Sequence, residues 1–172
     1  MSDSIPIQRV QVDLSGMILP NGLQVDRIVV GGDNVQIVPK PLDLILSGPG
    51  ALSAELTEGE LARFISGQLP AAVRDVEVQC IGGRLQVAAI AKVVFEIRAI
   101  AMCRLEIVDG RFLYVRLESV EPGGPVGSLI ESQIDRINPV FDAADLPLPV
   151  TLHSVASEAG RLTVSGTFEW VS

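Results

Sequence analysis

The segment KVVFEIRAIAMCRLEIV, residues 92–108, decides the fold class, because apolar and polar side chains alternate along most of it. Alternation with a period of two is typical of a β-strand with one buried face. Both faces become apolar near residues 99–102, which predicts a bend or bulge there. The buried face is predicted to carry Val93, Phe95, Ile97, Ala99, Ala101, Cys103, Leu105 and Ile107, and the outward face Lys92, Glu96, Arg98, Arg104 and Glu106.

Shorter alternating runs surround this strand, and glycine-containing turns separate many of them. Asn21-Gly22, Gly83, Asp109-Gly110 and Gly160 each stand just before a run that restarts the alternation. Such turns join antiparallel neighbours, since parallel strands need longer crossovers. The sequence therefore predicts a meander of hairpins in which the further strands include residues 10–14, 42–46, 76–80, 113–117 and 162–170.

Two segments change to helical periodicity. Thr57 and Glu60 form a capping box at the start of a helix over residues 57–69, and Pro70 follows its end. A second helix is predicted over residues 126–138, after the turn Pro122-Gly123-Gly124-Pro125. Each helix has one apolar stripe, which is expected to cover the sheet. The stripes contain Leu61, Phe64, Ile65 and Leu69 in the first helix and Val126, Leu129, Ile130, Gln133, Ile134 and Ile137 in the second. Together these elements predict one α+β domain over residues 1–172, with a strongly curved antiparallel sheet wrapping two amphipathic helices.

Composition narrows the classes of partner. The formal net charge is −8 and no block of basic residues stands out, so nucleic acid is not expected as a partner. No apolar run is long enough for a membrane helix, which leaves peripheral contact as the expected relation to a membrane. Hydrophobic residues make up 48% of the chain. This content is consistent either with a large packed core or with an apolar groove that binds a lipid or another apolar small molecule.

Candidate lining residues for such a groove come from the helix stripes and the facing strands. They are Leu61, Phe64, Ile65, Leu129, Ile130, Ile134, Val93, Phe95, Ile97 and Val115. Lys92, Arg98 and Arg104 share the outward face of the long strand. They are interpreted either as a solvated face or as a contact for an acidic headgroup.

Residue types that carry chemistry are few. His153 is the only histidine and there are two cysteines, so no ordinary zinc site can be assembled. Nucleotide-binding and hydrolase motifs are absent, and no pair of carboxylates is placed in one cleft. We therefore expect no enzyme, no metal and no cofactor. Cys80 and Cys103 are expected to be buried free thiols, with a bridge between two strands as the alternative.

The N-terminal sequence MSDSIPIQRV has no basic region followed by an apolar region, so no signal peptide is visible. The chain as given is therefore expected in the cytoplasm. If the sequence were a trimmed mature domain, the periplasm or the cell envelope would be expected instead.

Several short motifs occur in a characteristic order along nearly the whole chain, from about Val10 to Trp170. They are NGLQVDRIVV, LTEGELARFISGQLP followed by DVEVQC, then GGRLQV, VDGRFLYV, INPVF, LPLPVTLHSV and AGRLTVSGTFEW. Their order resembles the LmeA-like phospholipid-binding family. Relatives often carry an export signal or an anchor at the N-terminus, and this chain departs from them there.

The resemblance implies a domain similar to the tubular lipid-binding modules, with a curved sheet around an apolar groove that holds acyl chains, and with no catalytic motif. The predicted function is therefore the binding or carriage of a lipid acyl chain between the helices and the sheet. The alternative is a fully packed, non-catalytic interaction or assembly domain. The two differ in the volume of the space between helices and sheet.

Overall fold

A computed structural model gives the structure of the chain, and it describes residues 3–170. Within this range the chain forms eleven strands, two α-helices and one short 3-10 helix. The strands are β1 (Ile5–Ile18), β2 (Gln24–Pro39), β3 (Leu42–Leu46), β4 (Gly50–Thr57), β5 (Val73–Ile81), β6 (Arg84–Lys92), β7 (Glu96–Val108), β8 (Phe112–Glu121), β9 (Phe141–Asp142), β10 (Val150–Glu158) and β11 (Arg161–Phe168). The helices are α1 (Glu58–Gln68), α2 (Gly124–Ile137) and η1 (Ala143–Asp145).

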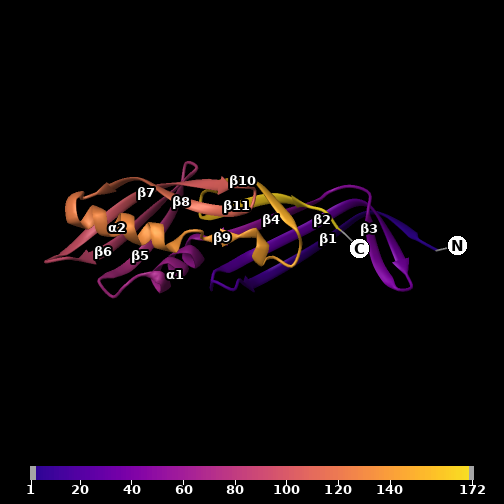
Figure 1. Cartoon of the computed structure of the whole chain (residues 1–172), viewed down its shortest axis with the longest axis horizontal. Helices are drawn as coiled ribbons and strands as arrows, with labels where there is room; N and C mark the ends of the chain where they lie inside the picture. Colours follow the sequence, from indigo (N-terminus) through magenta and orange to yellow (C-terminus); the bar gives the residue numbers. More distant parts are fainter. Residues whose placement is uncertain (1–2, 171–172) are drawn as a thin grey trace.

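The strands form two antiparallel sheets. The first has the order β1-β2-β4-β11-β10, with β3 also paired to β2, and the second has the order β5-β6-β7-β8-β9. Figure 1 shows an elongated molecule, with β5–β8 and both α-helices toward one end and β1–β3 toward the other. The α+β class and the strongly curved antiparallel architecture are confirmed. The division of the strands into two sheets was not predicted.

Contacts between β10 and the β5–β8 hairpins join the two sheets. The Leu152 amide donates to the Gly110 carbonyl at 2.6 Å. The buried Ser157 hydroxyl donates to the Arg84 carbonyl at 2.7 Å, and the Ser157 carbonyl accepts from the Gly83 amide at 3.0 Å. Gly110 has φ +61°, and a Cβ there would lie 2.9 Å from the Thr151 methyl group. Only glycine therefore fits this turn without a shift at the junction.

Both predicted helices are confirmed to within two residues at each end. The Thr57 hydroxyl accepts from the Glu60 amide at 3.2 Å, as the capping box predicts. The Glu60 carboxylate, however, bonds Arg63 at 2.8 Å, and Glu58 accepts from the Cys80 amide at 2.8 Å, which ties α1 to β5.

The second helix is fixed to the sheet at its C-terminal end. The Asn138 side chain accepts from the Val115 amide and donates to the Val115 carbonyl, both at 2.8 Å, so it pairs with β8 as a neighbouring strand would. The two α-helices cover one face of the second sheet, α1 over β5 and α2 over β7 and β8. Their apolar stripes and this face form the core at this end of the molecule.

The long central strand begins later than its alternation suggests. β7 starts at Glu96, which pairs with Lys92 of β6, so Val93–Phe95 form the turn of the β6–β7 hairpin. Val93 and Phe95 of this turn are in phase with the apolar face of the strand by coincidence, which is why the sequence predicts a longer strand. An irregularity is present where the β7–β8 register shifts, between Met102 and Cys103, at the edge of the segment predicted to bend.

Candidate functional site

The predicted space between helices and sheet is closed. Leu61, Phe64, Ile65, Ile130, Ile134 and Val115 are buried, and Leu129 is partly buried. The cavity that remains between α1, α2 and β5–β7 has a volume of about 30 Å³. That is about the volume of one water molecule in the liquid, so an acyl chain has no room there in this conformation.

The three groove residues predicted from the long strand lie in different surroundings. Ile97 packs at the margin of the core, whereas Val93 and Phe95 lie in the β6–β7 turn and are exposed. The structure therefore does not bring these two residues to the helices.

The predicted headgroup residues lie on the other face of the second sheet. Alternation along β7 places Arg98 and Arg104 opposite Ala99 and Ala101, which line the closed space beneath the helices. Lys92 is exposed, and Arg98 contacts Glu77 at 3.4 Å. Lys92, Arg98 and Arg104 are therefore separated by the sheet from the residues predicted to hold an acyl chain.

A different apolar groove lies open on the first sheet. Its volume is about 290 Å³ and its exposed surface is almost entirely apolar. Val12 is 47% exposed, Leu14 39% and Trp170 40%, so large apolar side chains of the groove contact solvent. The groove is lined by Val10, Val12, Leu14, Val30, Gly31, Gly32, Val35, Leu44, Leu46, Pro147, Leu148, Phe168 and Trp170.

The floor of the groove depends on a glycine in β2. A Cβ at Gly32 would lie 2.8 Å from Cδ2 of Leu46 on the neighbouring β3. Glycine therefore lets Leu46 pack closely over β2. Val35 and Phe168, both buried, complete the floor.

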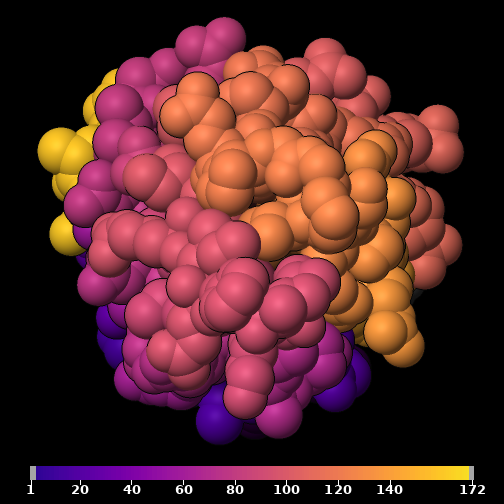
Figure 2. Space-filling model, turned by 90° about the vertical axis from the view of Figure 1, so that its left-hand side faces the viewer, coloured from indigo at the N-terminus to yellow at the C-terminus, as the bar shows by residue number. Residues whose placement is uncertain are grey.

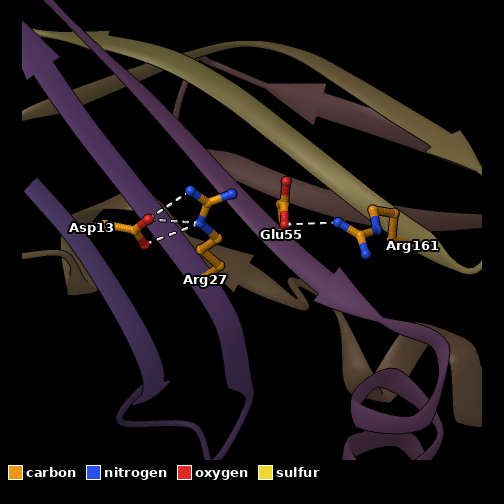
Figure 3. Close-up of polar contacts among 4 residues, drawn as sticks. All are labelled: Asp13, Arg27, Glu55 and Arg161. Atoms are coloured by element: carbon orange, nitrogen blue, oxygen red, sulfur yellow. Dashed lines mark hydrogen bonds and ion pairs between the residues drawn. The ribbon is translucent and has the colours of Figure 1, made fainter. Parts of the chain in front are cut away.

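Charge pairs lie on the face of the first sheet opposite the groove. Asp13 of β1 and Arg27 of β2 form an ion pair at 2.6 Å, and Glu55 of β4 and Arg161 of β11 form another at 3.0 Å (Figure 3). The hydrogen bond from Arg27 holds the pKa of Asp13 below its usual value. A slip of one residue along β1 would turn Asp13 into the groove, so its pair with Arg27 favours the register that leaves Val10, Val12 and Leu14 facing it.

A hollow of about 690 Å³ with a mixed polar and apolar surface borders the apolar groove. The two share Pro147, Leu148 and Phe168 as lining residues. The hollow also contains Arg111, whose guanidinium bonds both carboxylate oxygens of Asp142 at 2.7 and 2.9 Å. This pairing holds the pKa of Asp142 below its usual value. The apolar groove and this mixed hollow, which contains the Arg111–Asp142 pair, thus meet at Pro147 and Leu148.

The sequence offered three titratable side chains as candidates for chemistry: His153, Cys80 and Cys103. His153 is exposed and its Nε2 lies 2.7 Å from the Thr167 hydroxyl. Cys80 and Cys103 are free and buried. Both pair with Leu85 from opposite sides, so two strand spacings of about 5 Å separate them, which is too far for a disulfide. Burial raises the pKa of the Cys103 thiol to about 12 and also raises the pKa of Cys80, so neither is a reactive thiolate at neutral pH.

Residues 3–170 contain no group of three side chains suited to holding a metal ion. Neither of the two α-helices in that range is long and apolar enough to cross a membrane.

The fold and the groove define a class of protein: a curved antiparallel α+β domain that presents an open apolar surface on its sheet. The model of the LmeA-like phospholipid-binding family matches residues 6–167. The chain belongs to this family. No curated protein and no solved structure was found to match it.

None of the groove residues belonged to the sequence-based candidate set. The alternation of Val10, Val12 and Leu14 was visible in the sequence, and it indicated a strand face that needs a cover. The sequence did not indicate that α1 and α2 would leave this part of the first sheet open.

Proposed function

We propose that the protein binds a phospholipid by one of its acyl chains in the groove on the first sheet, without chemical conversion of the lipid. The observation that carries this proposal is the open groove lined by apolar side chains from β1, β2 and β3. Membership of a phospholipid-binding family supports the class of ligand. The mixed hollow beyond Pro147 and Leu148, with Arg111 in its lining, offers space for the headgroup.

The size of the groove is compatible with part of an acyl chain. A methylene group is similar in size to a water molecule, which occupies about 30 Å³ in the liquid. The groove volume of about 290 Å³ therefore corresponds to about ten methylene groups. Transfer of each methylene group from water contributes about 0.8 kcal/mol, so a chain seated there gains about 8 kcal/mol before the cost of association. This gain needs no charged anchor, and binding should depend only weakly on salt.

The same geometry argues against the fully packed alternative. A packed interaction domain would close its apolar surfaces with its own side chains, as α1 and α2 do on the second sheet. On the first sheet α1 packs against β2 and β4, but Val12, Leu14 and Trp170 stay exposed.

Two neighbouring substitutions in β1 test the proposal. Val12→Glu places a carboxylate in the groove, and Gln11→Glu adds the same charge one residue away on the opposite face, where Gln11 lines a separate hollow. Both sites are exposed, so both variants are expected to fold. An unpaired charge beside an acyl chain is costly, so Val12→Glu should reduce the affinity for a fluorescent phospholipid at least about tenfold, while Gln11→Glu leaves it near the wild-type value.

Native mass spectrometry of the gently purified protein is the companion measurement. We expect a phospholipid mass on the wild type and on Gln11→Glu, and a much smaller fraction on Val12→Glu. Equal lipid occupancy in all three proteins would contradict the proposed position of the chain.

A further inference from the structure

The end of the molecule that carries the helices also carries an exposed apolar tip. Val94 and Phe95 in the β6–β7 turn are each 75% exposed, and Val93 is 46% exposed. In Figure 2, which views the molecule from this end, the salmon-coloured segment around these residues faces the viewer. Consecutive large apolar side chains at such exposure cost free energy in water, so this tip needs an explanation of its own.

The β6–β7 hairpin extends beyond the end of the neighbouring strand β8. The last pair between β7 and β8 is Ile100↔Glu121, whereas β6 and β7 stay paired to Lys92↔Glu96. Four further residues of β7 therefore project past the end of β8, a length of about 13 Å at about 3.3 Å per residue. The Val93 amide donates to the Phe95 carbonyl at 3.4 Å, so part of the turn's backbone is hydrogen-bonded internally.

On its other side the tip is supported by the link between α1 and β5. The Lys92 amide donates to the Ala72 carbonyl at 2.8 Å, which places residues 70–72 beside the turn. Pro70, Ala71 and Ala72 are all exposed and carry no charge. The projecting turn and this link thus form an uncharged end surface, which we name the apolar tip and define as residues 70–72 and 93–95.

Charges behind the apolar tip balance one another. Arg74 bonds Asp75 and Glu96, each at 2.8 Å, and Arg98 contacts Glu77 at 3.4 Å. Together with Lys92, these residues make three cations and three anions on adjoining strands. The surface behind the tip is therefore close to neutral, while the whole chain has a net charge of −8. A partner with a strong net charge of either sign finds no complementary field here, and an anionic surface is repelled by the protein as a whole.

We infer that the apolar tip inserts into the interface of a zwitterionic lipid bilayer. The inference rests on the proposed function, because a phospholipid is so poorly soluble that a protein must meet a lipid phase to obtain it. A short apolar projection above a neutral polar ring fits the boundary between headgroups and acyl chains, where Phe95, Val94 and Val93 leave water and the charged side chains stay hydrated. Burial of these side chains supplies the attraction and the balanced charges make it nearly independent of salt.

Flotation with phosphatidylcholine vesicles tests the inference. The double variant Val94→Asp/Phe95→Asp places two carboxylates in the tip, and both positions are so exposed that folding should be unaffected. Ile81→Asp is the matched control, since Ile81 is an exposed apolar residue beside the β5–β6 turn of the same sheet. We expect the double variant to lower vesicle binding at least about tenfold, while Ile81→Asp and a rise in salt leave it nearly unchanged.

A second readout separates this inference from the proposed function. Lipid supplied as detergent-dispersed phosphatidylcholine should load the double variant as well as the wild type, because the groove on the first sheet is not altered. The inference is overturned if the double variant still floats with the vesicles, if the wild type does not float, or if binding requires anionic lipid and is lost in salt. If the wild type binds vesicles but takes up no lipid from detergent, the result contradicts the proposed lipid-binding groove and leaves the inference about the apolar tip intact.

Discussion

Phe64 marks the difference between the two apolar regions at the scale of single residues. It is 7% exposed and belongs to the core between α1 and the sheets. Val12 is also apolar, but it is 47% exposed and lines the groove. Sequence periodicity identifies both as apolar-face residues, and it carries no information about whether another element covers that face.

Phe64→Asp should unfold the protein, because it removes a buried ring and leaves an unpaired charge in a packed core. Loss of the ring alone costs about 3–5 kcal/mol and the buried charge adds several more, against a typical total stability of about 5–15 kcal/mol. Circular dichroism and thermal unfolding measure the effect. Ser66→Asp, on the exposed face of the same helix, is the control and should retain a cooperative transition. A well-folded Phe64→Asp protein would show that the core is more open than described here.

At the scale of elements, the sequence predicted strands and helices well where two independent signals agreed. The α1 boundaries follow from a capping residue, an apolar stripe and a terminal proline acting together. The start of β7 was predicted too early because alternation was the only signal, and Val93 and Phe95 of the turn are in phase with it. The turn became visible only through the pairing of Lys92 with Glu96.

The Asn138 clamp is a feature that no sequence pattern indicated. Its side-chain amide replaces a strand partner for Val115, and its two hydrogen bonds hold the end of α2 on β8. Asn138→Ala leaves one backbone donor and one acceptor without these partners, so we expect a loss of about 1–3 kcal/mol in the free energy of unfolding. Denaturant titration measures it, with Ser132→Ala on the exposed side of α2 as the control. A loss no greater than that of the control would mean that α2 is held by its apolar stripe alone.

At the scale of the whole molecule, the chain has more apolar sheet surface than its helices can cover. α2 packs on the second sheet, and α1 packs against β5 of that sheet and against β2 and β4 of the first sheet, which still keeps an open apolar groove. Composition indicated this apolar excess, and the antiparallel α+β class followed from alternation and turns. The position of the groove could not be predicted, because it depends on which strands pair into which sheet, and local patterns do not specify that.

The central claim is that an acyl chain lies in the groove of the first sheet, and the single tryptophan of the chain lines that groove. The most direct test is quenching of Trp170 fluorescence by a phospholipid with brominated acyl chains, measured after loading from detergent and removal of unbound lipid. We predict strong quenching in the wild type and in Gln11→Glu, and little in Val12→Glu. Bound brominated lipid that leaves the emission of Trp170 unchanged in the wild type would contradict the account, because the acyl chain would then lie elsewhere.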